Sequence, residues 1–384
     1  MSLQRLAVAT YFPRDPEKPS GGVEAVSVNL VRALAARREF SVDVVTLDPG
    51  IESPVQTEWT GARLHRLPRG EGSELGTALR QGRARVQQYL LGLAPDVVHA
   101  HDTFGIMVQG LPLPRVFTIH GFIHGDTLVS GRKFARLRSW MWKHYETAAW
   151  ADQPDIISIS PYVRERLTGI ARGVIHDIDN PISEPFFAIE RREQPGSIFC
   201  AAAICPRKNQ LALVEAVARL ARRGIDAELR LAGGVTDPGY GEQVAEAIRR
   251  HGIGDRVKML GQIGTPQVMR ELETASVFAL VSLEENSPMG IEEAMAARVP
   301  VLTSNRCGMP YMVRSGETGY LVDPFDVADI AGRLAKLLGD AGLRRDMGER
   351  AHEVARSRFH PSYVAGRTTE VYRDSLERAR NRGR

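Results

Sequence analysis

The stretch Ser282–Val301, SLEENSPMGIEEAMAARVPV, carries the most informative pattern in the chain. It follows an apolar run, Val277–Val281, that is typical of a buried strand. A helix-period segment, Gly290–Ala297, comes next, and a second apolar run follows at Val299–Thr303. A strand, a helix and a strand in direct succession predict a parallel βαβ unit.

The same alternation extends from this unit toward both ends of the chain. A connection rich in proline and charge, Asn180–Gly196, divides it into two halves. Further predicted strands lie at Leu6–Ala9, Val42–Leu47, Val97–His99, Val116–Ile119, Ile156–Ile159, Ile198–Ala203, Glu228–Ala232 and Val257–Leu260. We therefore predict an α/β fold of two Rossmann-like, doubly wound parallel-sheet domains, 1–185 and 186–360, with a ligand cleft at the carboxyl ends of their strands.

Composition narrows the class of protein. The chain has 384 residues, 43% hydrophobic and 25% charged, which excludes wholesale disorder. The formal charge is +4, but the basic residues are dispersed and no zinc-finger spacing is present, so we predict no nucleic-acid partner. Three cysteines form neither a disulfide framework nor a metal motif, and neither a leader peptide nor an apolar stretch of spanning length is indicated. These features predict a cytoplasmic protein.

The loop that opens the Gly290–Ala297 helix is suited to an anionic ligand. A helix N-terminus offers free backbone N–H groups and the positive end of the helix dipole, which favours a diphosphate. Glu285 precedes the turn and Glu293 lies about one turn inside the helix, where a carboxylate can accept hydrogen bonds from sugar hydroxyls. Capping of the helix by Glu285 or Glu292 is the competing interpretation.

A glutamate, seven residues and then Glu-Ala-Met-Ala, counted from Glu285, resemble the signature of the retaining glycosyltransferases of family 4, which have the GT-B fold. The resemblance implies that Glu293 holds the nucleotide ribose and that Glu285 contacts the donor sugar. It also implies that the intervening backbone binds the distal phosphate, through Asn286, Ser287, Met289 and Gly290.

Two segments of the first half are similar to the same family. Gly21-Gly22 resembles its glycine loop, whose main chain approaches the diphosphate closely; a plain strand-to-helix turn is the alternative. Thr118-Ile119-His120-Gly121 resembles the segment whose histidine reaches the junction of sugar and phosphate, although a histidine after a strand is more often structural. We interpret His99 and His101 as scaffold or rim, and we predict neither a metal site nor a cofactor besides the nucleotide sugar.

The second half adds Pro206-Arg207-Lys208-Asn209, between a strand and a helix. Lys208 matches the lysine with which the family binds the donor phosphate, where a compact cation stabilises the developing charge. A solvated loop lysine is the alternative. The segment 315–322 resembles the family's late turn and strand, and Phe359 with Tyr372 resembles its closing helix, which implies that residues 361–384 cross back to the first domain.

Three positions depart from the family's pattern. An arginine expected five residues before the lysine is Ala203 here, and Arg207 is the candidate substitute. The glutamate of a Gly-Gly-x-x-Glu stretch is Tyr311, and Arg298 stands where glycine is usual. These departures bear on which donor is bound and on activity, not on the fold.

The segment Arg132–His144, RKFARLRSWMWKH, mixes basic and aromatic residues. Such a helix either packs its tryptophans near the cleft or lies on an anionic membrane surface. The second interpretation predicts peripheral contact with the inner face of the membrane. The last residues of the chain, RARNRGR, predict a solvated terminus.

Together these patterns predict a retaining glycosyltransferase that moves a sugar from a nucleoside diphosphate sugar, with UDP as the first choice, to a hydroxyl group. The acceptor is a glycan, a lipid-linked molecule or a small molecule. A nucleotide-sugar epimerase of the same fold and a catalytically silent nucleotide-sugar-binding protein are the alternatives. An NAD-dependent dehydrogenase is the least favoured alternative, because no G-x-G-x-x-G follows the first strand.

Overall fold

The computed structural model describes residues 3–128 and 134–382. The chain forms two compact units. Unit 1 comprises the chain up to Pro181 together with the segment from Pro361 onward, and unit 2 comprises Ile182–His360. None of the helices in the described ranges is both long enough and apolar enough to cross a lipid bilayer.

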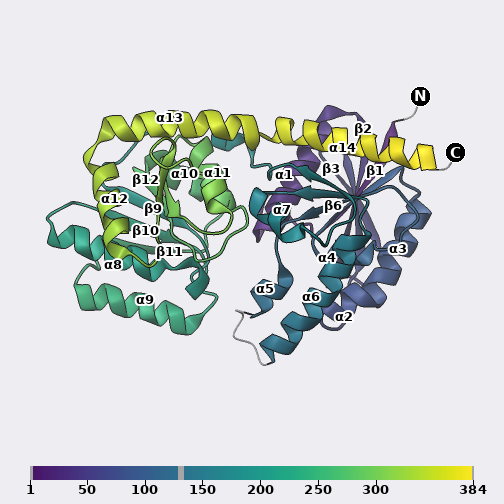
Figure 1. The fold of residues 1–384 in the computed structure, drawn as a ribbon, viewed down its shortest axis with the longest axis horizontal. Coiled ribbons are helices and arrows are strands. Elements are labelled where there is room, and N and C mark those ends of the chain that lie inside the picture. The colour runs from purple at the N-terminus through teal and green to yellow at the C-terminus, as the bar shows by residue number, and fades with distance from the viewer. Residues whose placement is uncertain (1–2, 129–133, 383–384) are drawn as a thin grey trace. The chain divides into compact units, whose positions relative to one another are not determined.

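Unit 1 is built on a twisted sheet (Figure 1). Its strands are β1 (Gln4–Ala9), β2 (Phe40–Asp48), β3 (Val55–Trp59), β4 (Ala62–Pro68), β5 (Val97–His101), β6 (Arg115–Ile119), β7 (Asp155–Ser158) and β8 (Val174–Asp177). The strand order is β3-β4-β2-β1-β5-β6-β7-β8. All neighbouring pairs are parallel except β3 with β4, which is antiparallel.

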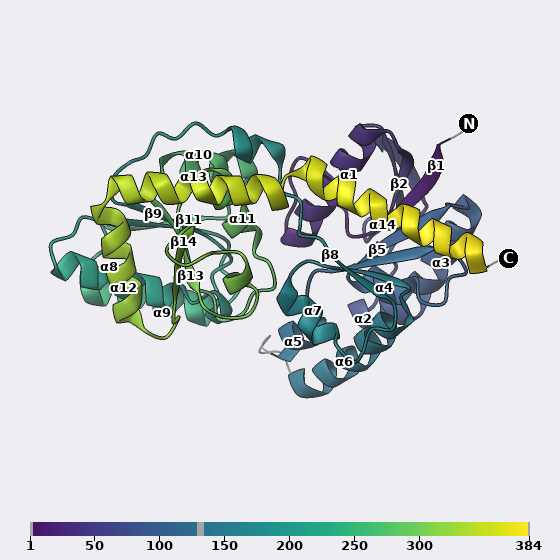
Figure 2. The same ribbon diagram turned by 45° about the horizontal axis from the view of Figure 1, so that its top comes forward.

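Helices cover both faces of this sheet. They are α1 (Gly22–Arg37), α2 (Glu74–Leu79), α3 (Gln81–Leu93), α4 (Thr103–Met107), α5 (Ile123–Leu128), α6 (Ala135–Asp152), α7 (Pro161–Leu167) and α14 (Pro361–Arg382). Helices α1 and α14 pack against each other (Figure 2). Their apolar residues, such as Leu30 and Val371, share a core with one face of the strands. Side chains of α3, α4 and α6, such as Leu90, Phe104 and Trp150, fill a second core on the other face.

Unit 2 has a smaller, wholly parallel sheet. Its strands are β9 (Ser197–Ala201), β10 (Glu228–Ala232), β11 (Val257–Gly261), β12 (Val277–Leu280), β13 (Val301–Ser304) and β14 (Gly319–Val322). They follow the order β11-β10-β9-β12-β13-β14. Strands such as Val277–Leu280 are completely buried, which explains why they read as continuous apolar runs.

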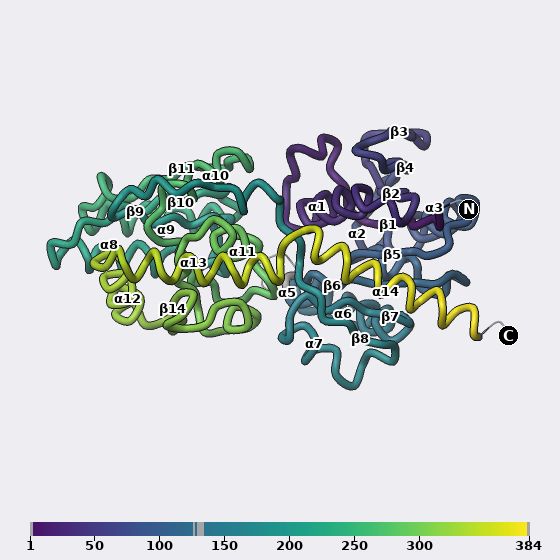
Figure 3. Tube along the Cα trace, turned by 90° about the horizontal axis from the view of Figure 1, so that it is seen from above, coloured from purple at the N-terminus to yellow at the C-terminus, as the bar shows by residue number. Residues whose placement is uncertain are grey.

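The helices of unit 2 are α8 (Gln210–Arg222), α9 (Pro238–His251), α10 (Thr265–Thr274), α11 (Met289–Ala296), α12 (Val327–Gly339) and α13 (Ala341–Arg358). Helices α8 to α11 connect successive strands, and α12 and α13 follow the last strand, β14. Helices α8 and α12 lie side by side (Figure 3). A single large core extends through the unit, from Phe186 to Phe359. The predicted fold class, two α/β parallel-sheet domains, is confirmed.

The strand order of each sheet reverses at one point. In unit 1 the reversal lies between β1 and β5, and in unit 2 it lies between β9 and β12. Ligands of open parallel sheets bind outside the carboxyl ends of the strands at such a reversal. The loops after β9 and β12 are therefore where unit 2 should bind its ligand.

Candidate functional site

Arg207 and Lys208 both form ion pairs with the carboxylate of Glu285, at the point where the strand order of the unit 2 sheet reverses. A short 3-10 turn, Pro206–Lys208, follows β9, and Glu285 follows β12. The ammonium group of Lys208 forms an ion pair with Oε1 of Glu285. Arg207 lies 3.2 Å from Oε2 of the same carboxylate and also donates to the carbonyl oxygen of Glu284 at 2.8 Å. The structure thus brings together three residues that the sequence analysis singled out.

Glu285 is almost fully buried, with 8% of its surface exposed. Burial of an ionised carboxylate is costly unless it is paired, and the two cations compensate the charge. Arg207 and Lys208 contact the two oxygens of the same carboxylate, so their positive charges lie near each other. An arriving diphosphate would therefore find two positive charges already positioned at the same point.

Helix α11 begins at Met289, as the sequence predicted within one residue, and Pro288 is its N-cap. By helix geometry, the N–H groups of Met289 and Gly290 have no acceptor within the helix. Both residues are partly exposed. A Cβ atom at Gly290 would lie 2.9 Å from the ring of Phe278, so the close packing of α11 on β12 requires glycine here.

Glu293 lies one turn into α11 and differs from Glu285 and Glu292. No side chain in the described ranges is bonded to its carboxylate: neither a hydrogen bond nor an ion pair is formed. The carboxyl group of Glu293 is half-buried, and desolvation disfavours its ionised form. Its pKa is therefore raised to about 8. A carboxylate with unused acceptor capacity is suited to bind hydroxyl groups of a ligand.

Glu292, one of the two capping candidates, is not the N-cap of α11; that position is Pro288, which makes no side-chain capping hydrogen bond. The hydroxyl of Ser287 donates to Oε1 of the fully buried Glu292 at 2.7 Å, across the first turn of α11. The alternative that Glu285 caps the helix is not what the structure shows, since Glu285 pairs with Arg207 and Lys208. Ser287 therefore shapes the turn with its side chain.

Residues without an assigned role in the sequence analysis hold these loops. The side-chain amide of Asn209 donates to the carbonyl oxygens of Val281 (3.2 Å) and Pro324 (2.9 Å), which ties the turn after β9 to the end of β12. Asn209 has a φ of 55°, a left-handed conformation that asparagine tolerates better than most residues. Asparagine directly before a helix was the available signal for this role.

The backbone of Gly308 supports the loop from its other side. Its N–H donates to the carbonyl oxygen of Glu285 at 2.8 Å. A Cβ atom at Gly308 would lie 1.8 Å from the carbonyl oxygen of Asn286, so only glycine permits this approach. Asn286 thus owes its backbone position to Gly308.

In unit 1, Gly21 is the N-cap of α1 and Gly22 is its first residue. The backbone at Gly21 is extended, with a φ of −157° that any residue adopts, and no atom lies within 4 Å of where its Cβ would be. The protein's own packing therefore does not require glycine at position 21. Glycine at this position leaves the space beside the backbone open.

His120 follows β6 and belongs to a buried row of histidines. Its Nε2 lies 2.7 Å from Nδ1 of His101, and the two rings are stacked. His99 neighbours His101 and is bonded through Nδ1 to the hydroxyl of Tyr372 on α14 and through Nε2 to Thr118, both at 2.7 Å. His99 and His101 are completely buried, in agreement with a scaffold role.

Burial lowers the pKa values of these histidines. That of His120 falls to about 4 and that of His99 to about 3, and that of His101 is also well below its ordinary value. Asn180 opposes the shift at His120 through a hydrogen bond. All three imidazoles are therefore neutral near pH 7, and His120 can act there as a hydrogen-bonding group and not as a cation.

Asp102 is a further residue of this region that sequence reasoning missed. It sits between β5 and α4 with a φ of 45°, and its carboxylate accepts a hydrogen bond from the backbone N–H of His120 at 3.3 Å. Unfavourable backbone conformations of this kind cluster at functional sites. Its position directly after His101, at the reversal point of the sheet, was the signal.

The three residues that depart from the family's pattern, Ala203, Arg298 and Tyr311, have different environments in unit 2. Arg298 has a φ of 59°, where glycine is favoured, and pairs with Glu349 at 3.3 Å. Tyr311 is 40% exposed. The carbonyl oxygen of Ala203 accepts a hydrogen bond from the side chain of Gln210 at 2.8 Å. Within the described parts of the chain, no group of three His, Cys, Asp or Glu residues is arranged to hold a metal ion.

Family models match both halves of the chain. Residues 20–184 match the model described as "Glycosyltransferase Family 4", and residues 182–354 match "Glycosyl transferases group 1". The two matches together extend over residues 20–354 and include every residue of the candidate site.

Individual relatives carry related names. N-acetyl-alpha-D-glucosaminyl L-malate synthase of Bacillus anthracis is 30% identical over 169 residues, which is 44% of this chain and 43% of that protein. A GDP-mannose-dependent alpha-(1-6)-phosphatidylinositol monomannoside mannosyltransferase of Mycobacterium tuberculosis is 27% identical over 58% of this chain and 62% of its own length. The matched region thus spans less than two thirds of either relative.

Solved structures agree over nearly the whole chain. Sucrose-phosphate synthase from Thermosynechococcus elongatus superposes with a TM-score of 0.81 and 20% identity, covering 97% of this chain and 99% of that one. HepE from Anabaena, solved in complex with UDP-glucose, gives a TM-score of 0.72 and 16% identity over 96% and 99%. These likenesses show that the fold is GT-B. The two family matches place the chain among the glycosyltransferases of family 4, the group 1 glycosyl transferases.

Proposed function

We propose that this protein transfers a glycosyl unit from a nucleoside diphosphate sugar to a hydroxyl group, with retention of configuration at the anomeric carbon. The observation that carries the proposal is the meeting of Arg207, Lys208 and Glu285 beside the N-terminus of α11, at the reversal point of a parallel sheet. Cations, helix N–H groups and a sugar-facing carboxylate are the groups that a nucleotide sugar requires.

Each group has a part in donor binding. Lys208, Arg207 and the N–H groups of Met289 and Gly290 would bind the diphosphate, whose negative charge grows as the bond to the sugar breaks. Glu293 would accept hydrogen bonds from the ribose hydroxyls with its unused carboxylate. When phosphate binds the cations, the carboxylate of Glu285 is released to contact the sugar.

The reaction would proceed on one face of the sugar. The bond between the anomeric carbon and the diphosphate oxygen breaks, and its electron pair leaves with the diphosphate. The acceptor oxygen forms its bond from the same side, and its proton passes to an oxygen of the leaving diphosphate. Glu285 is not placed as a nucleophile in this proposal, because two cations hold its charge.

We take UDP as the first nucleotide to test. HepE was solved with UDP-glucose, whereas the mannosyltransferase relative depends on GDP-mannose, so a panel of donors has to decide. The acceptor class follows from neither comparison, and a glycan, a lipid-linked molecule or a small molecule are all to be screened.

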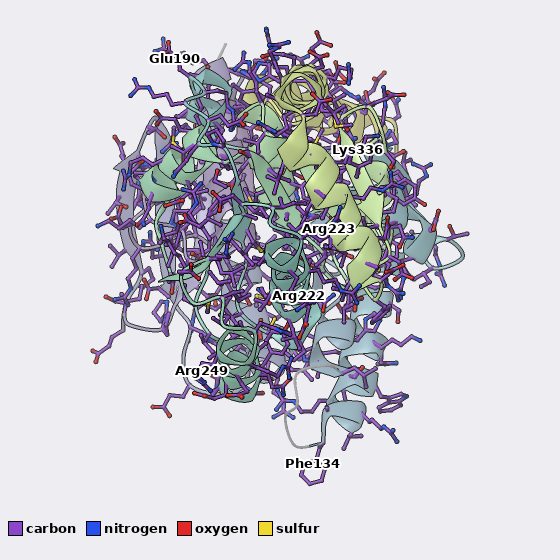
Figure 4. The ribbon with its side chains drawn as sticks, turned by 90° about the vertical axis from the view of Figure 1, so that its left-hand side faces the viewer. Phe134, Glu190, Arg222, Arg223, Arg249 and Lys336 are labelled. Atoms are coloured by element: carbon purple, nitrogen blue, oxygen red, sulfur yellow. The ribbon has the colours of Figure 1, made fainter. Side chains whose placement is uncertain are left out.

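The variants Lys208→Ala and Glu293→Ala test the assignment. Both should fold normally and lose sugar transfer, with kcat/KM reduced on the order of a hundredfold, as for the loss of one stabilising group in other transferring sites. Lys336→Ala and Glu190→Ala are matched controls, because both residues are exposed and lie at the surface of the same unit (Figure 4). Full activity in both site variants would refute the proposal.

Incubation with donor alone separates the rival functions. A transferase needs an acceptor for rapid turnover, whereas an epimerase would convert the sugar of the donor without one. Tight binding of a donor that no acceptor or incubation consumes would identify a nucleotide-sugar-binding protein without activity.

A further inference from the structure

Helix α6 of unit 1 exposes large apolar side chains on its outer face. Phe134, directly before the helix, is 77% exposed, Leu137 is 57% exposed and Trp140 is 68% exposed. Figure 4 shows Phe134 projecting away from the ribbon. These three residues define the outer face of α6.

This exposure is not a consequence of a loosely packed helix. The opposite face of α6 is well buried, with Trp142 and Trp150 only 4% and 3% exposed. At about 100° per residue, Leu137 and Trp140 lie on the side away from these two tryptophans. An exposed cluster of aromatic and aliphatic side chains on a packed helix marks an interaction surface.

Basic residues flank this apolar face on both sides. Arg136 and Lys143 lie along one flank of the helix and Arg138 along the other, and all three are exposed. The sequence from Phe134 to Tyr145 contains no acidic residue. The next acidic residue, Glu146, is buried, and it accepts hydrogen bonds from the backbone of Ile123 and His124 (2.8 and 2.9 Å).

We propose that the outer face of α6 docks on an anionic phospholipid bilayer. Phe134, Leu137 and Trp140 would enter the headgroup region, and Arg136, Arg138 and Lys143 would pair with lipid phosphates. An apolar centre flanked by Arg136, Arg138 and Lys143 is complementary to such a surface. A second copy of the same face would bring like charges together across a two-fold axis, which disfavours a dimer here.

Docking would also place the candidate site of unit 1 close to the bilayer. Helix α5, which packs closely against α6, begins three residues after His120. This consequence rests on the proposed function, because it makes a membrane-borne hydroxyl group the natural acceptor. Lipid binding itself does not depend on sugar transfer, and it is tested separately.

The experiment is sedimentation of the full chain with vesicles of phosphatidylcholine alone or with about 30% phosphatidylglycerol. The protein should bind the anionic vesicles and largely remain in solution with the neutral ones. The triple variant Arg136→Ala/Arg138→Ala/Lys143→Ala should reduce partitioning on the order of a hundredfold, since each basic residue near an anionic surface contributes about fivefold. The variant Leu137→Ala/Trp140→Ala should also bind weakly at every lipid composition.

The matched control is Phe325→Ala/Arg222→Ala/Arg223→Ala. It removes an equally exposed aromatic residue, 68% for Phe325, and two exposed arginines of unit 2, and it should bind vesicles like the wild type. Circular dichroism confirms that each variant is folded. The tryptophan fluorescence of the unmodified protein provides a measurement without variants. Its emission should shift to shorter wavelength with anionic vesicles, because Trp140 is the most exposed of the four tryptophans and would enter the headgroup region.

Three results would overturn the proposal. One is the absence of binding to anionic vesicles, together with unshifted tryptophan fluorescence. Another is binding that the α6 variants and the control variant reduce equally. The third is a dimer, detected by light scattering, that Leu137→Ala/Trp140→Ala converts to a monomer, since a second copy would then cover this face. Sugar transfer to a water-soluble acceptor should persist in the α6 variants, which separates this outcome from a failure of the transferase assignment.

Discussion

At the scale of single residues, the acidic side chains around α11 have three different environments. Glu285 is neutralised by two cations, Glu292 accepts from Ser287 inside the protein, and Glu293 has no partner in the described ranges and a raised pKa. Of these three residues, Glu293 alone has a carboxyl group that forms neither a hydrogen bond nor an ion pair within the described ranges. Adjacent residues of the same type therefore differ in burial and in bonding.

The raised pKa of Glu293 predicts proton release on donor binding. With a pKa of about 8, the free carboxyl group carries its proton at pH 7. Ribose hydroxyls that donate to the carboxylate favour the ionised form, so binding lowers the pKa and releases up to about one proton. Affinity should consequently rise with pH up to about 8.

Calorimetric titration in buffers of different ionisation enthalpy measures this release. Glu293→Gln provides the reference, since it retains the shape of the side chain and removes its titration. Equal proton release by the wild type and Glu293→Gln would assign the protons to the nucleotide and contradict the prediction.

Gly308→Ala should damage the donor site without unfolding the protein. The new methyl group would lie 1.8 Å from the carbonyl oxygen of Asn286, so the loop before α11 must move. We expect nucleotide affinity to fall about tenfold or more, because displaced backbone groups no longer meet the phosphate. Gly332→Ala, in α12 and with open space at its Cβ, should keep wild-type affinity and gain about 0.5–1 kcal/mol of stability. Affinity and thermal unfolding are the two measurements.

At the scale of elements, helix α14 secures the strand that bears His99 and His101. Tyr372 is fully buried on α14, and its hydroxyl is bonded to Nδ1 of His99 on β5. His101, two residues further along β5, contacts His120. Helix α14 thus holds His99 through a hydrogen bond between residues 273 positions apart. Through His99 and His101 it also contributes to the position of His120.

Tyr372→Phe should destabilise unit 1. It leaves Nδ1 of the buried His99 without a partner, and an unsatisfied buried polar group costs about 1–3 kcal/mol. Urea unfolding gives the difference in free energy. His99→Phe combined with Tyr372→Phe removes both polar groups and should recover part of this loss; a double variant that is no more stable than Tyr372→Phe would argue against the contact.

The elements also show where sequence patterns suffice. The helix predicted at Gly290–Ala297 is observed as α11, Met289–Ala296, displaced by one residue at each end. Strand β3 escaped prediction because Val55–Trp59 is an edge strand with largely exposed side chains, and β8 because Val174–Asp177 is short and half-buried. Neither has the buried apolar run on which the other strand predictions depended.

For the candidate site, sequence patterns identified the loops that carry the functional residues, but they did not predict the ion pairs between those loops. The turn at Arg207-Lys208 and the loop at Glu285 were singled out separately, each on its own pattern. The ion pairs of Arg207 and Lys208 with Glu285 form because β9 and β12 are neighbours in the sheet. A local sequence pattern does not predict which strands are neighbours. The contributions of Asn209, Gly308 and Asp102 are likewise tertiary. The tip of the predicted basic segment, Arg132 and Lys133, lies outside the described residues.

At the scale of the whole molecule, all residues proposed to bind the donor nucleotide through the α11 loop belong to unit 2. This unit has its own continuous core and its own sheet. A fragment of residues 182–360 should therefore fold alone and bind a nucleoside diphosphate without catalysing transfer, because His120 and Gly21-Gly22 belong to unit 1. Circular dichroism and calorimetry test it; a folded fragment with no nucleotide affinity would show that unit 1 is needed for binding.

The central claim is that unit 2 binds a nucleoside diphosphate sugar through Lys208 and Glu293. The most direct test is thermal unfolding of the full chain with UDP, GDP, ADP and TDP and with their common sugar conjugates. We predict that one nucleotide series stabilises the protein, by about 2.7 kcal/mol at a hundred times its dissociation constant, and that Lys208→Ala and Glu293→Ala lose this effect. A flat response across the panel, or an undiminished shift in both variants, would contradict the account.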